Sequence, residues 1–530
     1  MSINKKILVA SFIAVLLGAS SCKKYLNVNT NPNYAQVATV KTLLPAAELY
    51  VGTGLGVDLQ VAGNFYAQFW TQSPGASQFH NFDQYAPGQD ASSYGWTNLY
   101  NAEENLYQLY KLADSQKNTQ YMAIALLMQA YTFQLITDGW GDAPCKEALK
   151  GQYTDGHLVN PHYDPQDSIY TTILALIDSA NKLINPNAPI LPGTDDLIYG
   201  AAAATNQVNI MTYWQNFSNT LALKVYLRMS QVAPGTAAAG IAALYANPIT
   251  STFIGSAAGD SACIAYGFNS ANNNPLYADE LGLTGTRNFV GSASCLDTMS
   301  VENDPRLWVF YQPISGANFV GLQQGLYNGI PYTGYSYPTA YVAGDGQNSA
   351  SGKAPVNLIT NYESFFLQAE AVARGWAPAT VSDMSLFYNG IQASFNYYSA
   401  GLNATYVAYY GGTATSTVDS DYLTQATGSM ANAPLWAQYP AAGTVQQKVQ
   451  YIITQKWFAM CGNQGFEAWS EWRRTGYPSW FTYSVSTIIG NTFPKRLLYP
   501  TSESTVNSNY PGLAPLTSRV WWDVTAATDH

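Results

Sequence analysis

Aromatic side chains interleaved with polar ones are the residues of this sequence best suited to bind a ligand. The chain has 40 Tyr, 20 Phe and 13 Trp among its 530 residues. Sugar rings present C–H faces that stack on aromatic rings, while a few polar groups bond their hydroxyls, a mixture typical of small-molecule sites. Residues 79–85 and 327–337 show this mixture, the second with four tyrosines among turn-forming residues. The candidate binding residues are Phe79, Asn81, Phe82, Tyr85, Tyr327, Tyr332, Tyr335 and Tyr337.

For any single aromatic ring, packing in the core is the alternative to ligand contact. Rings in loop-like stretches are the better ligand candidates, and the ligand they suit is neutral and rich in hydroxyls. Rings with helical surroundings are expected in the core: Trp96, Trp214, Trp469 and Trp472.

Residue patterns for catalysis or metal binding are weak. None of the four histidines belongs to an HExxH pair, and His157 and His162 are five residues apart in a loop-like stretch. No G-x-S-x-G motif occurs, and the glycines of residues 52–56 lack the Lys-Ser/Thr of a phosphate loop. We therefore expect no catalytic residue, no metal site and no cofactor.

Two pairs of carboxylates would suit a glycoside hydrolase if they faced each other across a cleft, about 5–10 Å apart. Glu363 with Glu370, and Glu467 with Glu471, each lie on one helical face. An arginine follows Glu370 by four residues and two more closely follow Glu471, so local ion pairs explain the carboxylates. An α-rich hydrolase is kept only as an alternative.

The N-terminus predicts export. Lys5 and Lys6 precede an apolar run at residues 7–17 and then small residues up to Cys22, the pattern of a secretory signal peptide. A largely apolar run of 11 residues is too short to span a bilayer. We expect a lipoprotein signal peptide at residues 1–21 and lipidation at Cys22, although Ala19 stands where Leu is usual. The alternative is ordinary secretion with an incidental cysteine.

Composition excludes several classes of protein. Lys and Arg number 23 and Asp and Glu 33, a net charge of −10 that argues against nucleic-acid binding. Hydrophobic residues reach 47%, yet no stretch after the signal peptide approaches the roughly 20 apolar residues of a membrane-spanning helix. The chain is therefore expected to be neither disordered nor an integral membrane protein.

Hydrophobic periodicity predicts helices. Between residues 121 and 135, apolar side chains recur at spacings of 3, 4, 3 and 4, as an amphipathic helix requires, and residues 169–183 repeat the rhythm. Further candidates are residues 97–114, 213–230, 361–374, 383–399 and 446–460. Helices of this size suggest pairs of the tetratricopeptide type, although no strict 34-residue repeat is visible.

Long stretches rich in Gly, Ser, Asn and Tyr separate these helices, and loops of such length are usually functional or disordered. Their aromatic content speaks against disorder. The expected fold is mainly α, a tetratricopeptide-like helix-pair superhelix with long irregular excursions, and residues 22–530 are expected to form a single domain. The excursions cover about residues 71–95, 185–212, 250–360 and 400–443.

Four cysteines remain after Cys22, and their spacing matches no zinc pattern. We expect buried thiols, with a Cys263–Cys295 bridge as the alternative. The four residues are Cys145, Cys263, Cys295 and Cys461.

Ordered motifs between about residues 27 and 510 give the chain a resemblance to a known family. In chain order they are Asn27-Val-Asn-Thr-Asn-Pro-Asn33, Asp138-Gly-Trp-Gly-Asp-Ala-Pro144, Asp304-Pro-Arg306, Ala369-Glu370-Ala371, Gln455-Lys-Trp-Phe-Ala459, Glu467-Ala-Trp-Ser-Glu-Trp-Arg-Arg-Thr-Gly-Tyr-Pro478 and Arg496-Leu-Leu-Tyr-Pro500. As an ordered set they resemble the SusD/RagB-like nutrient-binding outer-membrane lipoproteins of Bacteroidetes, in particular the branch with W-G-D-x-P and W-R-R-T-G-Y-P motifs.

The resemblance implies a binding protein without catalysis, anchored by lipid in the outer membrane and exposed at the cell surface. It also implies a partner, a SusC-like TonB-dependent transporter, to which the protein delivers oligosaccharide or, in some members, peptide. Most motif residues would be scaffold, with Glu370, Arg473 and Arg474 fixing helix packing. The aromatic platform of the family would fall in about residues 71–95 and 275–340, and its individual residues do not transfer.

Overall fold

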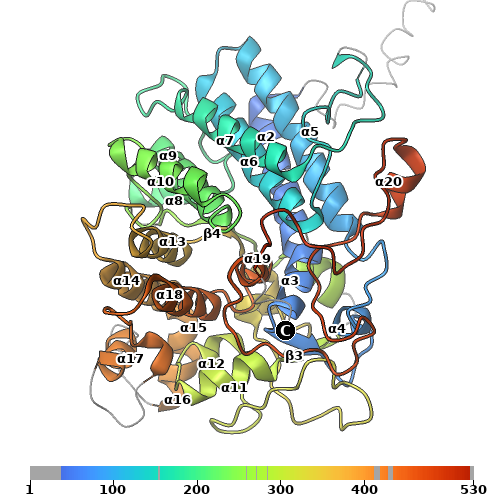
Figure 1. Ribbon diagram of the computed structural model, residues 1–530, viewed down its shortest axis with the longest axis vertical. Helices are drawn as coiled ribbons and strands as arrows, with labels where there is room; N and C mark the ends of the chain where they lie inside the picture. Colours follow the sequence, from blue (N-terminus) through green and yellow to red (C-terminus); the bar gives the residue numbers. More distant parts are fainter. Residues whose placement is uncertain are drawn as a thin grey trace, which may run out of the picture.

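The protein is described by a computed structural model over residues 38–152, 155–257, 259–269, 271–282, 285–410, 418–427 and 434–525. The expected signal peptide (residues 1–21), the lipidation site Cys22 and the Asn-rich residues 27–33 lie outside the described residues. Within them the chain is mainly helical, as expected (Figure 1). No helix of this described part combines the length and the apolar character needed to cross a membrane.

The scaffold consists of helix pairs, α2 packed with α5, α6 with α7, α9 with α10, and α13 with α14. Helix α18 extends the last pair, and the short helices α3 and α19 cross at the centre of the molecule (Figure 1). Their bounds are α2 (Val40–Gly54), α3 (Gln60–Tyr66), α5 (Ser93–Ser115), α6 (Thr119–Trp140), α7 (Gln166–Asn181), α8 (Gly200–Asn206), α9 (Ile210–Arg228), α10 (Pro234–Ala246), α13 (Asn361–Ala373), α14 (Asp383–Tyr397), α18 (Val445–Ala459) and α19 (Gly465–Thr475).

The helices expected from periodicity are confirmed in α5, α6, α7, α9, α13, α14 and α18. Helix α6 is buried from Gln120 to Trp140 because α5, α7 and α9 pack around it. Helix α2 was not predicted. Pro45 lies inside it, and the glycines at its end are typical of a loop. The four tryptophans assigned to the core are buried, as predicted.

The excursions are present, but they contain short regular elements that periodicity did not predict. Strand β1 (Trp70–Gln72) pairs antiparallel with β3 (Phe289–Gly291), and β2 (Ala262–Ile264) pairs antiparallel with β4 (Val356–Ile359). The first pair ties the early excursion to the mid-chain excursion. The short helices are α4 (His80–Asp83), η2 (Leu55–Leu59), η4 (Tyr277–Leu281), α11 (Ala293–Val301), α12 (Leu307–Phe310), η5 (Ala340–Val342), η6 (Ser349–Lys353), α15 (Ser399–Leu402), η7 (Asn403–Val407), α16 (Ala408–Tyr410), α17 (Val418–Thr427), η8 (Leu435–Ala437) and α20 (Thr501–Val506).

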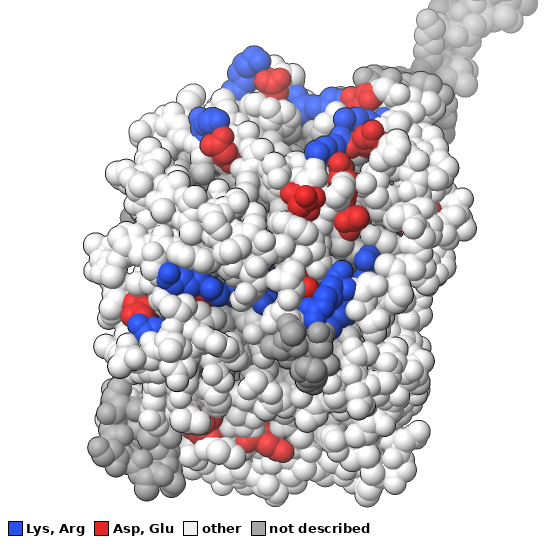
Figure 2. Space-filling model, in the orientation of Figure 1, with Lys and Arg blue, Asp and Glu red and all other residues white. Residues whose placement is uncertain are grey.

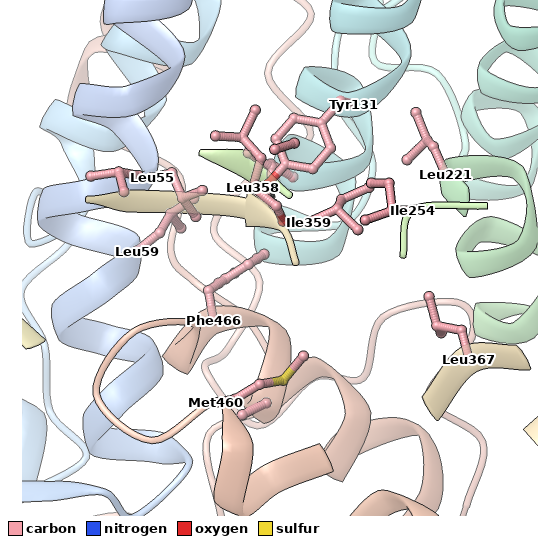
Figure 3. Close-up of a cluster of buried hydrophobic side chains, with 14 of the residues drawn as sticks. Leu55, Leu59, Tyr131, Leu221, Ile254, Leu358, Ile359, Leu367, Met460 and Phe466 are labelled. Carbon is pink, nitrogen blue, oxygen red and sulfur yellow. Dashed lines mark hydrogen bonds between the residues drawn. The ribbon is translucent and has the colours of Figure 1, made fainter. Parts of the chain in front are cut away.

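The crossing of α3 and α19 requires a glycine. A Cβ added to Gly63 would lie 2.1 Å from the backbone nitrogen of Phe466, so a larger residue would push the helices apart. Around this crossing, Figure 3 shows Phe466 and Met460 below β4, whose Leu358 and Ile359 lie between the η2 segment and Tyr131 of α6. The core therefore joins segments from both halves of the chain.

Beside this core lies a buried network of ion pairs. The Arg228 guanidinium bonds Glu467 at 2.7 Å and Glu471 at 2.6 Å, and Arg474 bonds Glu370 at 2.7 Å. Burial alone would raise the pKa of Glu467, but Arg228 and the nearby lysines lower it to about 2. These carboxylates are thus held as paired anions, which explains why they are tolerated in the core.

The local ion pairs expected from the sequence form only part of this network. Arg374 pairs with Glu370 at 2.8 Å, as expected for residues four apart on a helix. Arg473, in contrast, donates to the backbone carbonyls of Asp138 and Lys495. Its guanidinium also lies 3.7 Å from the ring centre of Trp469. The helix α19 motif is therefore a packing element, in agreement with the scaffold role that the resemblance implied.

Candidate ligand-binding surface

The early excursion and the mid-chain excursion meet at Asp83, which is fully buried. Its carboxylate accepts hydrogen bonds from the Thr71 hydroxyl at 2.6 Å and the Gln72 backbone N–H at 2.7 Å. The Gln324 side-chain amide donates to it at 2.6 Å from the mid-chain excursion. Burial raises the pKa of Asp83 to about 7, although these hydrogen bonds oppose the shift. This carboxylate therefore fixes the two regions in which a binding surface was expected.

Four of the eight predicted binding residues are buried at this junction. Phe79 stacks on Phe289, with ring centres 5.0 Å apart. Tyr327 is 5% exposed, and its ring stacks on His80 at 4.0 Å. The residues in this group are Phe79, Phe82, Tyr85 and Tyr327. Because other side chains cover their faces, we assign them to the support of the surface and not to ligand contact.

The other four predicted residues reach the surface. Tyr332 is 68% exposed and lies beside the early excursion at Gly75. Asn81 is exposed, and Tyr335 and Tyr337 are half-buried. The Arg287 guanidinium covers one face of Tyr337, 4.6 Å from the ring centre. Tyr332 is therefore the predicted ring with the most accessible faces, and the binding role of these four residues stays a prediction.

A second aromatic group, which we call the Trp308 cluster, was not predicted from the sequence. Its rings come from α12, from the mid-chain excursion and from the turn formed by η7 and α16. The Trp308 ring centre lies 4.8 Å from that of Tyr409 and 5.7 Å from that of Tyr410. The members are Trp308, Phe319, Tyr406, Tyr409 and Tyr410.

The outer rings of the Trp308 cluster are open to solvent. Tyr409 is 51% exposed and Tyr410 is 57% exposed, whereas Trp308 is buried at the base. A cavity of about 180 Å³ lies beside the rings. Its lining includes Phe319 and exposed Asn303. The Trp308 cluster thus combines aromatic faces for stacking with a polar residue at the edge of the cavity. A ligand with apolar faces and hydroxyl groups requires this combination.

One sequence signal could have revealed this cluster. Tyr406, Tyr409 and Tyr410 have spacings of 3 and 4, which place three rings on one side of a single helical turn. Trp308 follows two residues after the Asp304-Pro-Arg306 motif. The sequence did not indicate that the two segments are neighbours.

Larger cavities lie elsewhere on the described part of the chain. Their walls contain fewer aromatic residues, or the aromatic residues in their walls are buried and packed against other side chains. A cavity of about 460 Å³ has Tyr477 as the one aromatic among the described residues that line it. Another of about 350 Å³ is lined by Trp96 and Tyr100. Trp96 is only 4% exposed, and its indole N–H donates to Glu503 at 3.3 Å. We therefore place the candidate site at the Trp308 cluster.

Charge is sparse over much of the surface. On the face drawn in Figure 2, Lys and Arg side chains gather across the middle, and pairs of opposite charge lie toward the top. Much of the lower part of this face, toward α11 and α12 in Figure 1, is uncharged. In the described ranges, no group of three or more His, Cys, Asp or Glu residues could hold a metal ion. The uncharged lower part of this face therefore suits a neutral ligand better than an ionic one.

Comparisons with known proteins place the chain among the relatives expected from its motifs. Residues 32–500 match the model of the SusD-like_2 family, described as starch-binding and associating with the outer membrane. No curated protein matches the chain.

Solved structures share the fold at low sequence identity. A chitin-binding SusD homologue from Flavobacterium johnsoniae is 21% identical with a TM-score of 0.69, over 92% of this chain and 99% of that chain. A SusD homologue from Bacteroides fragilis is 20% identical with a TM-score of 0.69, over 92% of this chain and 99% of that chain. A SusD-like protein from Bacteroidetes is 21% identical with a TM-score of 0.70, over 92% of this chain and 100% of that chain.

Proposed function

The chain belongs to the SusD-like family, and we propose that it is a cell-surface lipoprotein that captures oligosaccharide and delivers it to a SusC-like TonB-dependent transporter in the outer membrane. The observation that carries this proposal is the Trp308 cluster, where Tyr409 and Tyr410 offer exposed rings and Tyr410 lines a cavity. The protein acts by binding alone and uses no cofactor.

The geometry supports a ligand that lies across the surface. A cavity of about 180 Å³ is smaller than the roughly 300–1,000 Å³ of a site that encloses a drug-sized molecule. One sugar ring would occupy it, and further rings would extend over Tyr409 and Tyr410. Stacking of this kind gives micromolar to millimolar affinity, on the order of 4–8 kcal/mol. Such binding suits a protein that must release its cargo to a transporter.

Two groups of oligosaccharides are the first ligands to test. The family description names starch, and a similar structure is described as chitin-binding. Isothermal titration with malto-oligosaccharides and chito-oligosaccharides, with peptides as the comparison, would measure the preference. Binding of a sugar that is lost in a Tyr409→Ala/Tyr410→Ala double variant would support the proposal. Binding of peptides with no response to any sugar class would favour the alternative, the same scaffold with peptide cargo.

Delivery and anchoring need separate measurements. Purification of the native protein from outer membranes should recover a TonB-dependent barrel as its partner, and Cys22→Ala should release the protein from the membrane. Recovery without a barrel would contradict the transport part of the proposal. The remaining alternative, an α-rich hydrolase, requires that the purified protein release reducing sugar and that one Asp or Glu variant abolish this activity.

A further inference from the structure

Two buried cysteines from distant parts of the chain lie side by side. The Sγ atoms of Cys295 and Cys461 are 3.7 Å apart, although the residues are separated by 166 positions. Both side chains are fully buried. All four described cysteines are free thiols in this structure. Cys263, the partner of Cys295 in the alternative considered from the sequence, lies on β2. The structure therefore singles out a pair that spacing along the chain did not suggest.

We propose that Cys295 and Cys461 form a disulfide in the exported protein, linking the mid-chain excursion to the end of α18. The proposal rests on the export proposed above, because disulfides persist in oxidising compartments outside the cytosol. The two thiols lose two protons and two electrons as the S–S bond forms. A dithiol–disulfide oxidant takes up both and is itself reduced from one disulfide to two thiols.

The distance between the sulfur atoms is compatible with this bond. A disulfide is about 2.0 Å long, so the two Sγ atoms must approach each other by roughly 1.7 Å. Both belong to short side chains, Cys295 inside α11 and Cys461 two residues after the end of α18.

The surroundings tolerate the loss of both thiol protons. The Cys295 thiol lies 3.8 Å from the Met299 sulfur, a weak acceptor that needs no donor. The Cys461 sulfur lies 3.2 Å from the Tyr311 hydroxyl. That hydroxyl donates to the Phe69 carbonyl at 2.8 Å, and this bond does not involve either cysteine. Oxidation therefore leaves no strong buried donor or acceptor without a partner.

Burial determines when the bond can form. Burial raises the pKa of the Cys461 thiol well above its usual range, so in the folded protein this sulfur is a poor nucleophile. Neither sulfur is accessible to an oxidant once the core has closed. Oxidation thus belongs to folding after export, before α11 packs against its neighbours.

The bond would stabilise the part of the molecule that carries the candidate site. Helix α11 contains Met299 and Ser300, which line the cavity of the Trp308 cluster. A cross-link that closes a loop of 166 residues restricts the unfolded chain strongly, and in a chain of this size it raises the melting temperature by about 5 °C.

The test is a thiol map of the native protein isolated from outer membranes. The protein is denatured with an alkylating reagent present and digested with trypsin without reduction. We expect peptides 288–306 and 457–473 as one cross-linked species, because cleavage after Arg287, Arg306, Lys456 and Arg473 separates the two cysteines from the others. Cys145 and Cys263 should be alkylated directly. Direct alkylation of Cys295 and Cys461 would overturn the proposal.

Variants provide a second readout that does not depend on export or on any ligand. The mature chain is refolded with oxidised glutathione or with dithiothreitol, and its melting temperature is compared. We expect the oxidised protein to melt about 5 °C higher, with the difference lost in Cys295→Ser and kept in the control Cys263→Ser. An equal difference in Cys295→Ser would contradict the assignment. Because no sugar is used, failure here is distinct from failure of the proposed binding function.

Discussion

The Gln324 side-chain amide donates to the Asp83 carboxylate at 2.6 Å, across 241 positions of the sequence. This contact adds to the pairing of β1 with β3, which also joins the early excursion to the mid-chain excursion. It is made by a carboxyl group that is completely buried. The protonation state of this one side chain therefore affects a junction between the two excursions.

The first prediction concerns pH. Burial raises the pKa of Asp83 to about 7 in the folded protein, whereas it is about 3.8 when exposed. The folded state thus keeps a proton that the unfolded state releases, and stability should fall as pH rises from about 4 to 7, by about 4 kcal/mol. Urea unfolding of the wild type and of Asp83→Asn across this range should show a shallower slope in the variant. Equal slopes would contradict the buried titration.

The second prediction concerns the Trp308 cluster. Tyr409→Ala and Tyr410→Ala each remove an exposed ring, so we expect each to weaken oligosaccharide binding by about 1 kcal/mol, roughly fivefold. The matched control is Tyr50→Ala, which removes a 37% exposed ring from α2. Titration calorimetry measures all three. A loss in Tyr50→Ala as large as in the cluster variants would show that the effect is not local.

The third prediction separates ligand contact from support among the residues chosen from the sequence. Tyr332 is exposed, so Tyr332→Ala should leave the melting temperature unchanged and reduce oligosaccharide affinity. Phe79 is buried against Phe289, so Phe79→Ala should cost about 3–5 kcal/mol of stability. Thermal unfolding and titration of both variants test the distinction. Unchanged affinity in Tyr332→Ala would remove the 327–337 stretch from the binding surface.

The fourth prediction concerns the buried ion pairs. Arg474 bonds both Glu370 and Glu471, and its replacement by Met leaves two buried carboxylates without their main partner. We expect Arg474→Met to cost about 3–5 kcal/mol in denaturant unfolding. The matched variant Arg374→Met removes a partly exposed partner of Glu370 that Arg474 can replace, and should cost about 1 kcal/mol or less. Similar losses in both would argue against a special role for Arg474.

The fifth prediction concerns the crossing of α3 and α19. Alanine normally stabilises a helix relative to glycine by up to about 1 kcal/mol. At Gly63 the added Cβ would lie 2.1 Å from the Phe466 nitrogen, so we expect Gly63→Ala to destabilise the protein by about 1–3 kcal/mol or more. Gly88→Ala, where nothing lies within 4 Å, is the control and should be nearly neutral. Stabilisation by Gly63→Ala would contradict the close approach.

Much of the helical scaffold could be predicted because its signal is local. The spacing of apolar residues between 121 and 135 is a property of one segment, and α6 forms there. The ordered motifs likewise identified the family that residues 32–500 match. Helix α2 was not predicted because Pro45 and the glycines at its end weaken the local helical pattern. In the folded protein, packing against α5 stabilises the helix despite these residues.

Local patterns and ordered motifs were enough to identify this protein as a mainly helical member of its family with aromatic-rich excursions. The accessibility of each ring became visible only in the folded chain. Residues 79–85 and 327–337 have the composition of a binding surface, yet Phe79 is buried against Phe289 of β3, and Tyr327 is buried against His80. The neighbourhood of Trp308 and Tyr409 arises from segments 101 positions apart. Exposure of a ring depends on which distant segment covers it, and local composition carries no information about that contact.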